Sequence, residues 1–321
     1  MKRVLLIALI SSGVSLSFAQ TQIGNSGFET WETVPSTTFT EPTNWNSFLT
    51  ASGSLNSNAA NQIEQSTDVR PGTSGVSSAR IYERLILGFI KANGNLTLGR
   101  INMGSATAGN ADANYNASIT ADPNFSEALT DTPDSLVFWA KYVPTENSKQ
   151  ARVKASLHDD YDYHDPEGTG GSATHIVATA VLDYSHTNNA WKRFSIPFDY
   201  TVATTANPNT YILITFTTNK TPGGGTGNDV VFIDDVELIY NPATSGISKI
   251  DKNDGIVVGM DNSTDNIIIT SVKDLKGSYK IYNTSGQEVQ NGAIASKISF
   301  EKGFGAYFVH LTTEGKEYTF E

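Results

Sequence analysis

Cysteine is absent from the 321-residue chain, and charged residues are scarce at 17%. Without cysteine the chain can form no disulfide, thiolate nucleophile or thiolate zinc site, and no lipid can be attached through an N-terminal cysteine. Basic residues are fewer than acidic ones, with 22 Lys and Arg against 33 Asp and Glu, and the net charge is −11. Because nucleic acid is bound through a basic face, this balance argues against a nucleic-acid partner.

Long hydrophobic runs are also missing, except at the N-terminus. There Lys2 and Arg3 precede an apolar stretch over 4–18, and Ser17-Phe18-Ala19 suits cleavage by signal peptidase after Ala19. The stretch is too short and too rich in serine to favour a membrane span, and no later segment approaches one. We therefore expect a signal peptide over 1–19, no transmembrane segment, and a mature protein that is secreted or attached to the outer cell surface.

The composition changes near residue 242. All eleven prolines lie at or before Pro242, and no tryptophan or arginine follows it. The stretch "NPATSG" at 241–246 has the residues of a turn or linker. A chain of this length accommodates two domains, and we predict them over 20–242 and 243–321.

Both predicted domains have the pattern of β-strands. Short segments rich in β-branched and aromatic residues alternate with clusters of Gly, Asn, Asp and Pro, which predicts an all-β fold of antiparallel sandwiches. Helical turns remain possible over 78–90 and in "SEALTD" at 126–131, and the Gly- and Asn-rich stretch 99–127 is predicted to be a long surface loop. The clearest strand segments are 134–143, 152–158, 174–184, 192–198, 210–218 and 230–240.

The order of motifs in the first domain resembles a known family. "NSGFETWE" at 25–32 and "RPGTSGVSSARI" at 70–81 are followed by "PDSLVFWAKYVP" at 133–144 and "FIDDVELIY" at 232–240. This order is similar to the carbohydrate-metabolism domain of exported Bacteroidetes proteins, over nearly all of 24–240. The resemblance implies a jelly-roll sandwich like that of carbohydrate-binding modules, and polysaccharide or another glycan as the partner.

The second domain resembles a different family. "GSYKIYNTSGQEVQNG" at 277–292 and "GFGAYFVHLTTEGKEYTF" at 303–320 are similar to the type A sorting domain of the type IX secretion system. The resemblance implies a small immunoglobulin-like sandwich that directs export through the type IX machinery. The chain ends on "YTFE", without the basic terminus that many such domains carry.

Two adjacent carboxylates interrupt the hydrophobic segment "VVFIDDVELIY" at 230–240. Successive side chains of a strand point to opposite faces, so Phe232, Asp234, Val236 and Leu238 are expected to share the core face. Asp234 is then the carboxylate that requires a partner. Asp235 would face the other way, so the two cannot flank one glycosidic bond as a catalytic pair.

Three partners for Asp234 stay open. A structural calcium ion would be held by oxygen ligands, and the family resemblance implies Glu29 and Asp234 as its ligands, with Asp235 second. An arginine such as Arg80 is the second alternative. Loop amides at a strand end are the third.

The most polar and aromatic stretch, "HDDYDYHDPEG" at 158–168, is the predicted site of sugar recognition. Tyr161 and Tyr163 offer ring faces for stacking, and Asp160 and Asp162 can accept protons from sugar hydroxyls. Trp45 is a further stacking candidate. We therefore predict a non-catalytic glycan-binding protein, with a glycoside hydrolase that uses a carboxylate pair on different strands as the alternative.

Overall fold

The computed structural model describes residues 20–86, 90–240, 255–261, 266–271, 275–284, 286–300, 307–313 and 315–320. The chain divides into two compact units between Tyr240 and Asn241. The predicted signal peptide at 1–19 and the predicted turn at 241–246 lie outside the described residues.

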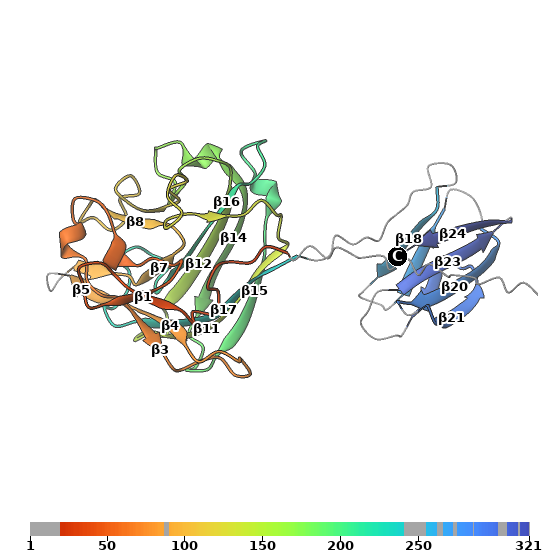
Figure 1. Cartoon of the computed structure of the whole chain (residues 1–321), viewed down its shortest axis with the longest axis horizontal. Helices are drawn as coiled ribbons and strands as arrows, with labels where there is room; N and C mark the ends of the chain where they lie inside the picture. Colours follow the sequence, from red (N-terminus) through yellow and green to blue (C-terminus); the bar gives the residue numbers. More distant parts are fainter. Residues whose placement is uncertain are drawn as a thin grey trace, which may run out of the picture. The chain divides into compact units, whose positions relative to one another are not determined.

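The first unit is a jelly-roll β-sandwich, which confirms the predicted all-β class (Figure 1). One antiparallel sheet, called here the β11 sheet, has the order β15-β11-β17-β4-β3. Its strands are β15 (Lys192–Pro197), β11 (Ser135–Val143), β17 (Val230–Ile239), β4 (Ser78–Tyr82) and β3 (Ile63–Ser66). The other, the β12 sheet, has the order β10-β16-β12-β14, with β7 also paired to β16. Its strands are β10 (Glu127–Ala128), β16 (Tyr211–Thr217), β12 (Gln150–His158), β14 (Ile176–Ser185) and β7 (Asn95–Thr97).

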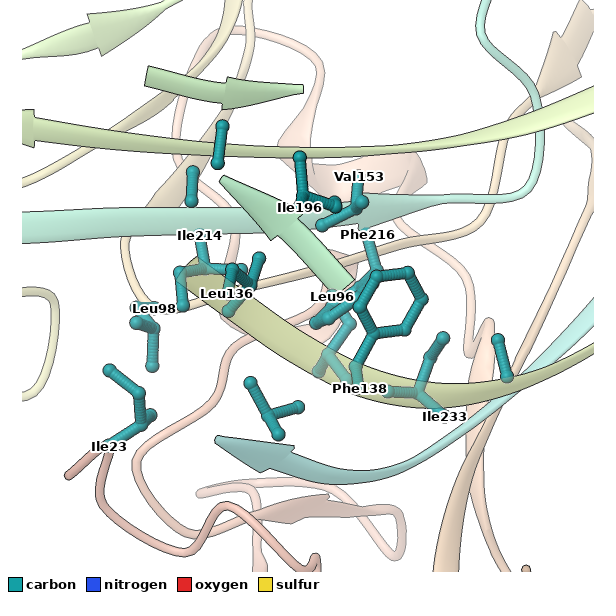
Figure 2. Packing of buried hydrophobic residues seen from close by; sticks show 14 of the residues in the cluster. Ile23, Leu96, Leu98, Leu136, Phe138, Val153, Ile196, Ile214, Phe216 and Ile233 are labelled. Atoms are coloured by element: carbon teal, nitrogen blue, oxygen red, sulfur yellow. The ribbon is translucent and has the colours of Figure 1, made fainter. Parts of the chain in front are cut away.

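The hydrophobic core lies between the two sheets. Alternation along β11 turns Leu136, Phe138 and Ala140 inward, and all three are fully buried. The ring of Phe138 meets that of Phe216 from β16 at a centroid distance of 5.2 Å. Figure 2 shows side chains of both sheets interleaved in this layer. Each strand of the core therefore keeps one face for packing and leaves the other for solvent or a ligand.

A β-bulge in β17 overturns the predicted faces of that strand. Val137 pairs with Glu237, but Trp139 pairs with Asp234, so β17 has one extra residue between the two pairs. Asp235 has a left-handed backbone with φ of +44° at this point. Ile233 is on the core side before the bulge and Val236 after it. The prediction that Asp234 shares the core face with Val236 is therefore wrong, because a bulge shifts the alternation by one residue.

Smaller elements surround the sandwich, and several correct the sequence predictions. Strands β4 and β5 (Arg84–Ile86) replace the helical turns expected over 78–90, and β10 lies in "SEALTD". The expected surface loop at 99–127 contains β8 (Arg100–Met103) and β9 (Asn114–Ala117), which form a three-stranded sheet with β13 (His164–Asp165). The hairpins are β1 (Trp31–Thr33) with β2 (Thr40–Pro42), and β5 with β6 (Ile90–Ala92). Four 3-10 turns lie at η1 (Phe48–Thr50), η2 (Asn56–Asn58), η3 (Ser172–Thr174) and η4 (Tyr200–Val202).

The second unit is a smaller β-sandwich. One sheet has the order β18-β19-β22, and the other has the order β21-β20-β23-β24. Ile256, Ile281 and Leu311 are fully buried at its core. The strands are β18 (Val257–Asp261), β19 (Asn266–Thr270), β20 (Gly277–Asn283), β21 (Glu288–Ala293), β22 (Lys297–Ser299), β23 (Tyr307–Thr313) and β24 (Lys316–Phe320). Across the described residues of the whole chain, no helix has the length and apolarity to cross a membrane.

Candidate ligand-binding groove

The outer face of the β12 sheet forms the floor of a groove of about 680 Å³, called here the sheet groove. Along β12, Ala151, Val153 and Ala155 turn into the core, so Arg152 and Lys154 point the other way. Arg152 pairs with Thr217 of β16 and Lys154 with Thr215. The antiparallel sheet thus places two cationic side chains beside two threonines at the base of the groove.

The walls of the sheet groove come from segments far apart in the sequence. They are the hairpin β5–β6, the strands β8 and β9 with the turn between them, the turns η1 and η2, and the segments 165–167 and 219–223. Phe48, Leu55, Ile86, Ile90, Ile101 and Met103 supply apolar surface, and Tyr115 of β9 supplies an aromatic ring. One face of the Tyr115 ring is covered by His164, with parallel rings at 4.0 Å.

The charges on the floor are neutralised within the protein. Lys154 Nζ lies 2.7 Å from a carboxylate oxygen of Asp165 and 2.7 Å from one of Glu167. Burial lowers the pKa of Lys154, but Asp165 and Glu167 outweigh it and raise that pKa above its ordinary value. Arg152 donates two hydrogen bonds to Asp183, at 2.6 and 3.2 Å. The groove therefore offers balanced polarity rather than a strong field of one sign.

Side-chain amides are the commonest polar groups of the groove. The lining includes Asn58, Asn93, Asn95, Asn102, Asn114, Asn116 and Asn219. Asn93 Oδ1, Asn116 Oδ1 and Asn219 Nδ2 are buried amide atoms without a hydrogen-bond partner in the protein. An unpartnered buried amide costs free energy, so these three atoms are places where an ordered water would complete the hydrogen bonding.

The loop at 158–168 contributes to the groove, but through residues other than those predicted. Asp165 and Glu167 line the groove. Tyr161 is half-buried, with its ring stacked on His175 at 3.8 Å and its hydroxyl donating to the Gly170 carbonyl oxygen. Asp160 is exposed, and exposed Asp162 accepts hydrogen bonds from the amide and hydroxyl of Thr120. None of Tyr161, Asp160 and Asp162 is among the groove-lining residues.

Two of the predicted stacking rings lie inside the protein. Tyr163 is 0% exposed, and its hydroxyl donates to Glu167 Oε1 at 2.8 Å. Trp45 is 1% exposed and packs against the rings of Phe28 and Phe216. Neither ring can stack on a sugar, because both are buried. Local sequence does not reveal the contacts that cover them. The prediction for these two residues is therefore corrected to core packing.

The adjacent carboxylates of β17 lie on the outer side of the β11 sheet. Asp234 is 1% exposed and accepts the backbone amide of Arg70 at 3.0 Å. Burial raises the pKa of Asp234 to about 6, although the amide of Arg70 opposes this. Asp235 accepts from Arg70 Nε at 2.5 Å. The hydrogen-bond partner of Asp234 is thus a loop amide, the third alternative, whereas the guanidinium of Arg70 pairs with Asp235 and that of Arg80 with Glu64.

Glu29, the other predicted calcium ligand, accepts hydrogen bonds from backbone amides. Its carboxylate accepts from the amide of Val76 at 3.0 Å and from that of Ser77 at 3.2 Å. In the part of the chain that the structure describes, no three Asp, Glu or His side chains are grouped as metal ligands. With Glu29 and Asp235 engaged in this way, Glu29, Asp234 and Asp235 fit calcium poorly. Calcium at these residues stays a prediction.

The main groove residues were not identified from the sequence, although a signal existed. In "RVKASLH" at 152–158, Arg152 and Lys154 alternate with Val153 and Ala155, which indicates two cations on the face opposite the core. The contribution of 99–127 had a weaker signal. Its strand segments "RINM" at 100–103 and "NYNA" at 114–117 alternate polar and apolar residues, but each has only four residues and the stretch between them is rich in Gly, Ala and Asn.

No family model matches the chain, and no match is found among curated proteins. Among solved structures, similar chains include two candidate glycoside hydrolases. That of Bacteroides thetaiotaomicron is 18% identical, with a TM-score of 0.45 over 61% of this chain and 63% of its own. That of Bacteroides vulgatus is 20% identical, with a TM-score of 0.45 over 65% and 89%. This chain thus spans less than two thirds of the first of these proteins.

A further similar structure is the family 11 carbohydrate-binding module of Clostridium thermocellum in complex with a β-1,3-1,4-mixed-linked tetrasaccharide. It is 13% identical, with a TM-score of 0.29 over 69% of this chain and 97% of its own. Similarity at this level carries no argument about function, so the proposals below rest on the groove itself.

Proposed function

We propose that the first unit binds a neutral polysaccharide in the sheet groove. The observation that carries the proposal is the groove itself: a sheet floor with the part-buried side chains of Arg152 and Lys154, enclosed by apolar and amide-rich walls, with a volume of about 680 Å³. This volume falls in the range of small-molecule and oligosaccharide sites.

The lining suits the two kinds of surface that a sugar ring presents. Side-chain amides such as those of Asn95 and Asn102 can form hydrogen bonds with sugar hydroxyls. The ring of Tyr115 and the side chains of Ile101 and Met103 can contact the apolar C–H faces of a sugar. Because Arg152 and Lys154 are paired with carboxylates, the floor has little excess charge to select a polyanion.

Binding without cleavage is favoured by the pairing of the two carboxylates in the groove with Lys154. Asp165 and Glu167 both contact Lys154 Nζ. Burial raises the pKa of Glu167, but Lys154 and the hydroxyl of Tyr163 outweigh it and lower that pKa. A glycosidase requires one carboxylic acid with a raised pKa as the proton donor. A carboxylate held as an anion by a lysine does not meet that requirement.

The proposal is tested by affinity electrophoresis of the mature chain in gels containing plant, algal or bacterial glycans. Tyr115→Ala should weaken the retardation by roughly 3- to 10-fold in Kd, the usual value of one aromatic contact. Tyr161→Ala is the matched control, because its ring lies outside the groove, and it should behave like the wild type. Retardation lost in Tyr161→Ala but kept in Tyr115→Ala would place the site elsewhere, and release of reducing sugar would favour the hydrolase alternative.

We also propose that the region 243–321 serves export through the type IX machinery, and that the first unit folds without it. Support comes from the motif resemblance over 277–320 and from the separation of the chain into two units. Deleting 243–321 should leave a folded protein in the periplasm, detected by fractionation and limited proteolysis. Truncated protein recovered outside the cell would contradict the sorting role.

A further inference from the structure

Two further carboxylates meet at one end of the β11 sheet. Glu83 directly follows β4 and Asp229 directly precedes β17, and the pairing of Tyr82 with Val230 brings them together. The amide of Glu83 donates to the carbonyl oxygen of Asp229 at 3.0 Å. Glu83 is 4% exposed and Asp229 is 0% exposed. Glu83, Asp229 and Tyr142 are called here the buried acid site.

The hydrogen bonds of this site are incomplete. Glu83 accepts from Thr218 Oγ1 at 3.1 Å and from the amide of Gly227 at 2.8 Å. Asp229 Oδ1 accepts from the amide of Thr145 at 2.7 Å and from Thr226 Oγ1 at 2.8 Å.

Asp229 Oδ2, however, is buried and has no partner, and the same holds for the hydroxyl of Tyr142, whose side chain is 0% exposed. Two buried oxygen atoms with unused hydrogen-bonding capacity thus belong to one small region.

No positive charge compensates the two carboxylates. Among the described residues, no ion pair joins Glu83 or Asp229 to a basic side chain. Burial, together with the charge of Asp229, raises the pKa of Glu83 even though Gly227 donates to it. Burial and both carboxylates also raise the pKa of Tyr142, so its hydroxyl stays protonated. A buried anion without a cation is costly.

The chain closes over this site with glycine. A Cβ at Gly225 would lie 1.8 Å from Glu83 Oε1, and Gly227, with φ of +95°, donates its amide to the same carboxylate. The loop "PGGGTG" at 222–227 therefore brings its main chain against the acids. Carboxylates and carbonyls are the oxygen ligands that calcium prefers.

We propose that Glu83 and Asp229 bind a calcium ion beneath the loop 222–227, with the hydroxyl of Tyr142 beside it. The ion supplies the missing positive charge and a partner for Asp229 Oδ2. The position differs from that of the calcium predicted from the sequence, because Asp229 precedes Asp234 by five residues along an extended strand, or roughly 17 Å.

The ion would also stabilise one wall of the sheet groove. Residues 219–223, which line that groove, lead directly into the loop over Glu83. Calcium is therefore expected to tighten glycan binding, an expectation that rests on the function proposed above. The ion site itself is tested without any glycan, so the two proposals can fail separately.

The first measurement is the melting temperature of the mature chain, stripped of metal and then given calcium chloride or EGTA. A ligand that binds only the folded state should raise the melting temperature by roughly 5–10 °C at a hundredfold excess over Kd. Asp229→Asn and Glu83→Gln should abolish the calcium response and melt lower than the wild type in calcium. Glu41→Gln, at a buried glutamate that Ser47 satisfies with two hydrogen bonds, is the matched control and should keep the response.

Terbium luminescence gives a second readout that does not depend on stability. Terbium replaces calcium and is excited through a nearby tyrosine, so the wild type should show emission on tyrosine excitation and Tyr142→Phe should lose most of it while keeping its calcium response. A melting temperature that is equal in calcium and EGTA would overturn the proposal. So would a response lost in Asp234→Asn but retained in Asp229→Asn. An Asp229→Asn variant more stable than the wild type in calcium would also overturn it, since removing an uncompensated buried charge should stabilise the fold.

Discussion

Acid should destabilise the first unit through His158, at the end of β12. His158 is 0% exposed and lies between the rings of Tyr163 and Tyr211, at 5.0 and 5.8 Å. Its Nδ1 is 2.9 Å from the carbonyl oxygen of Asp159, which can only accept, so Nδ1 is the donor. Nε2 therefore accepts from Ser118 Oγ at 2.8 Å. The neutral ring thus has both nitrogens satisfied, and a second proton would place a positive charge on a fully buried ring.

The size of the effect follows from the pKa. Burial lowers the pKa of His158 from 6.5 to about 4, a difference worth about 3 kcal/mol in the free energy of unfolding. Because the folded-state pKa is the lower one, the unfolded chain binds the proton first. The stabilisation is complete above pH 6.5 and is lost as the pH falls from about 6.5 to about 4.

The assay is urea unfolding at pH 7.5 and at pH 4.5, monitored by tryptophan fluorescence. All four tryptophans precede residue 243, so the signal reports the first unit. The wild type should lose about 2.5 kcal/mol more than His158→Gln over this interval. Glutamine does not titrate but can still accept from Ser118. His158→Phe should show the same flat profile at lower stability, by about 1–3 kcal/mol, because Ser118 Oγ loses its partner.

Parallel pH profiles for the wild type and His158→Gln would refute this reasoning. Since His158 supports the loop that carries Asp165 and Glu167 into the sheet groove, glycan binding by the wild type should also weaken toward pH 4.5. His158→Gln should retain more of its affinity in acid.

Three further outcomes are expected. Phe138→Ala should lower the free energy of unfolding by about 3–5 kcal/mol in urea titrations, because its ring fills the centre of the core between the sheets; a loss below 1 kcal/mol would contradict that packing. Lys154→Met should destabilise the first unit by roughly 3 kcal/mol and abolish glycan retardation, since Asp165 and Glu167 lose their shared cation; unchanged binding would place the ligand away from the floor. Arg70→Met should cost about 1 kcal/mol, because its ion pair with Asp235 is partly exposed. A melting temperature that falls in EGTA in the wild type but not in Asp234→Ala would instead support calcium at Glu29, Asp234 and Asp235.

The strand β17 shows how far alternation alone can be trusted. Its hydrophobic composition correctly predicts a strand, but the bulge at Asp235 exchanges the faces of its two halves. Nothing local in "VVFIDDVELIY" indicates the extra residue, because the bulge is defined by the register against β11. The need of Asp234 for a partner was predicted, whereas its partner, Arg70, lies 164 residues earlier in the chain.

The groove shows a second limit of prediction from the sequence. The alternation along β12 predicts that Arg152 and Lys154 lie on the face opposite the core. Whether that face is open, and which segments surround it, depends on where β8, β9 and the hairpin β5–β6 pack. Tyr163 and Trp45 are as aromatic in the sequence as Tyr115, but both are buried, Trp45 against the rings of Phe28 and Phe216.

By itself, the sequence determined the all-β class, because hydrophobic alternation and turn residues are local properties that each segment carries alone. It also determined that no disulfide or thiolate chemistry is available. Only the tertiary structure decided which aromatic rings are buried, which acids acquire partners, and that Asp229 and Tyr142 keep unpartnered oxygen atoms. These properties depend on contacts between residues far apart in the chain, and neither burial nor pairing is defined before those contacts form.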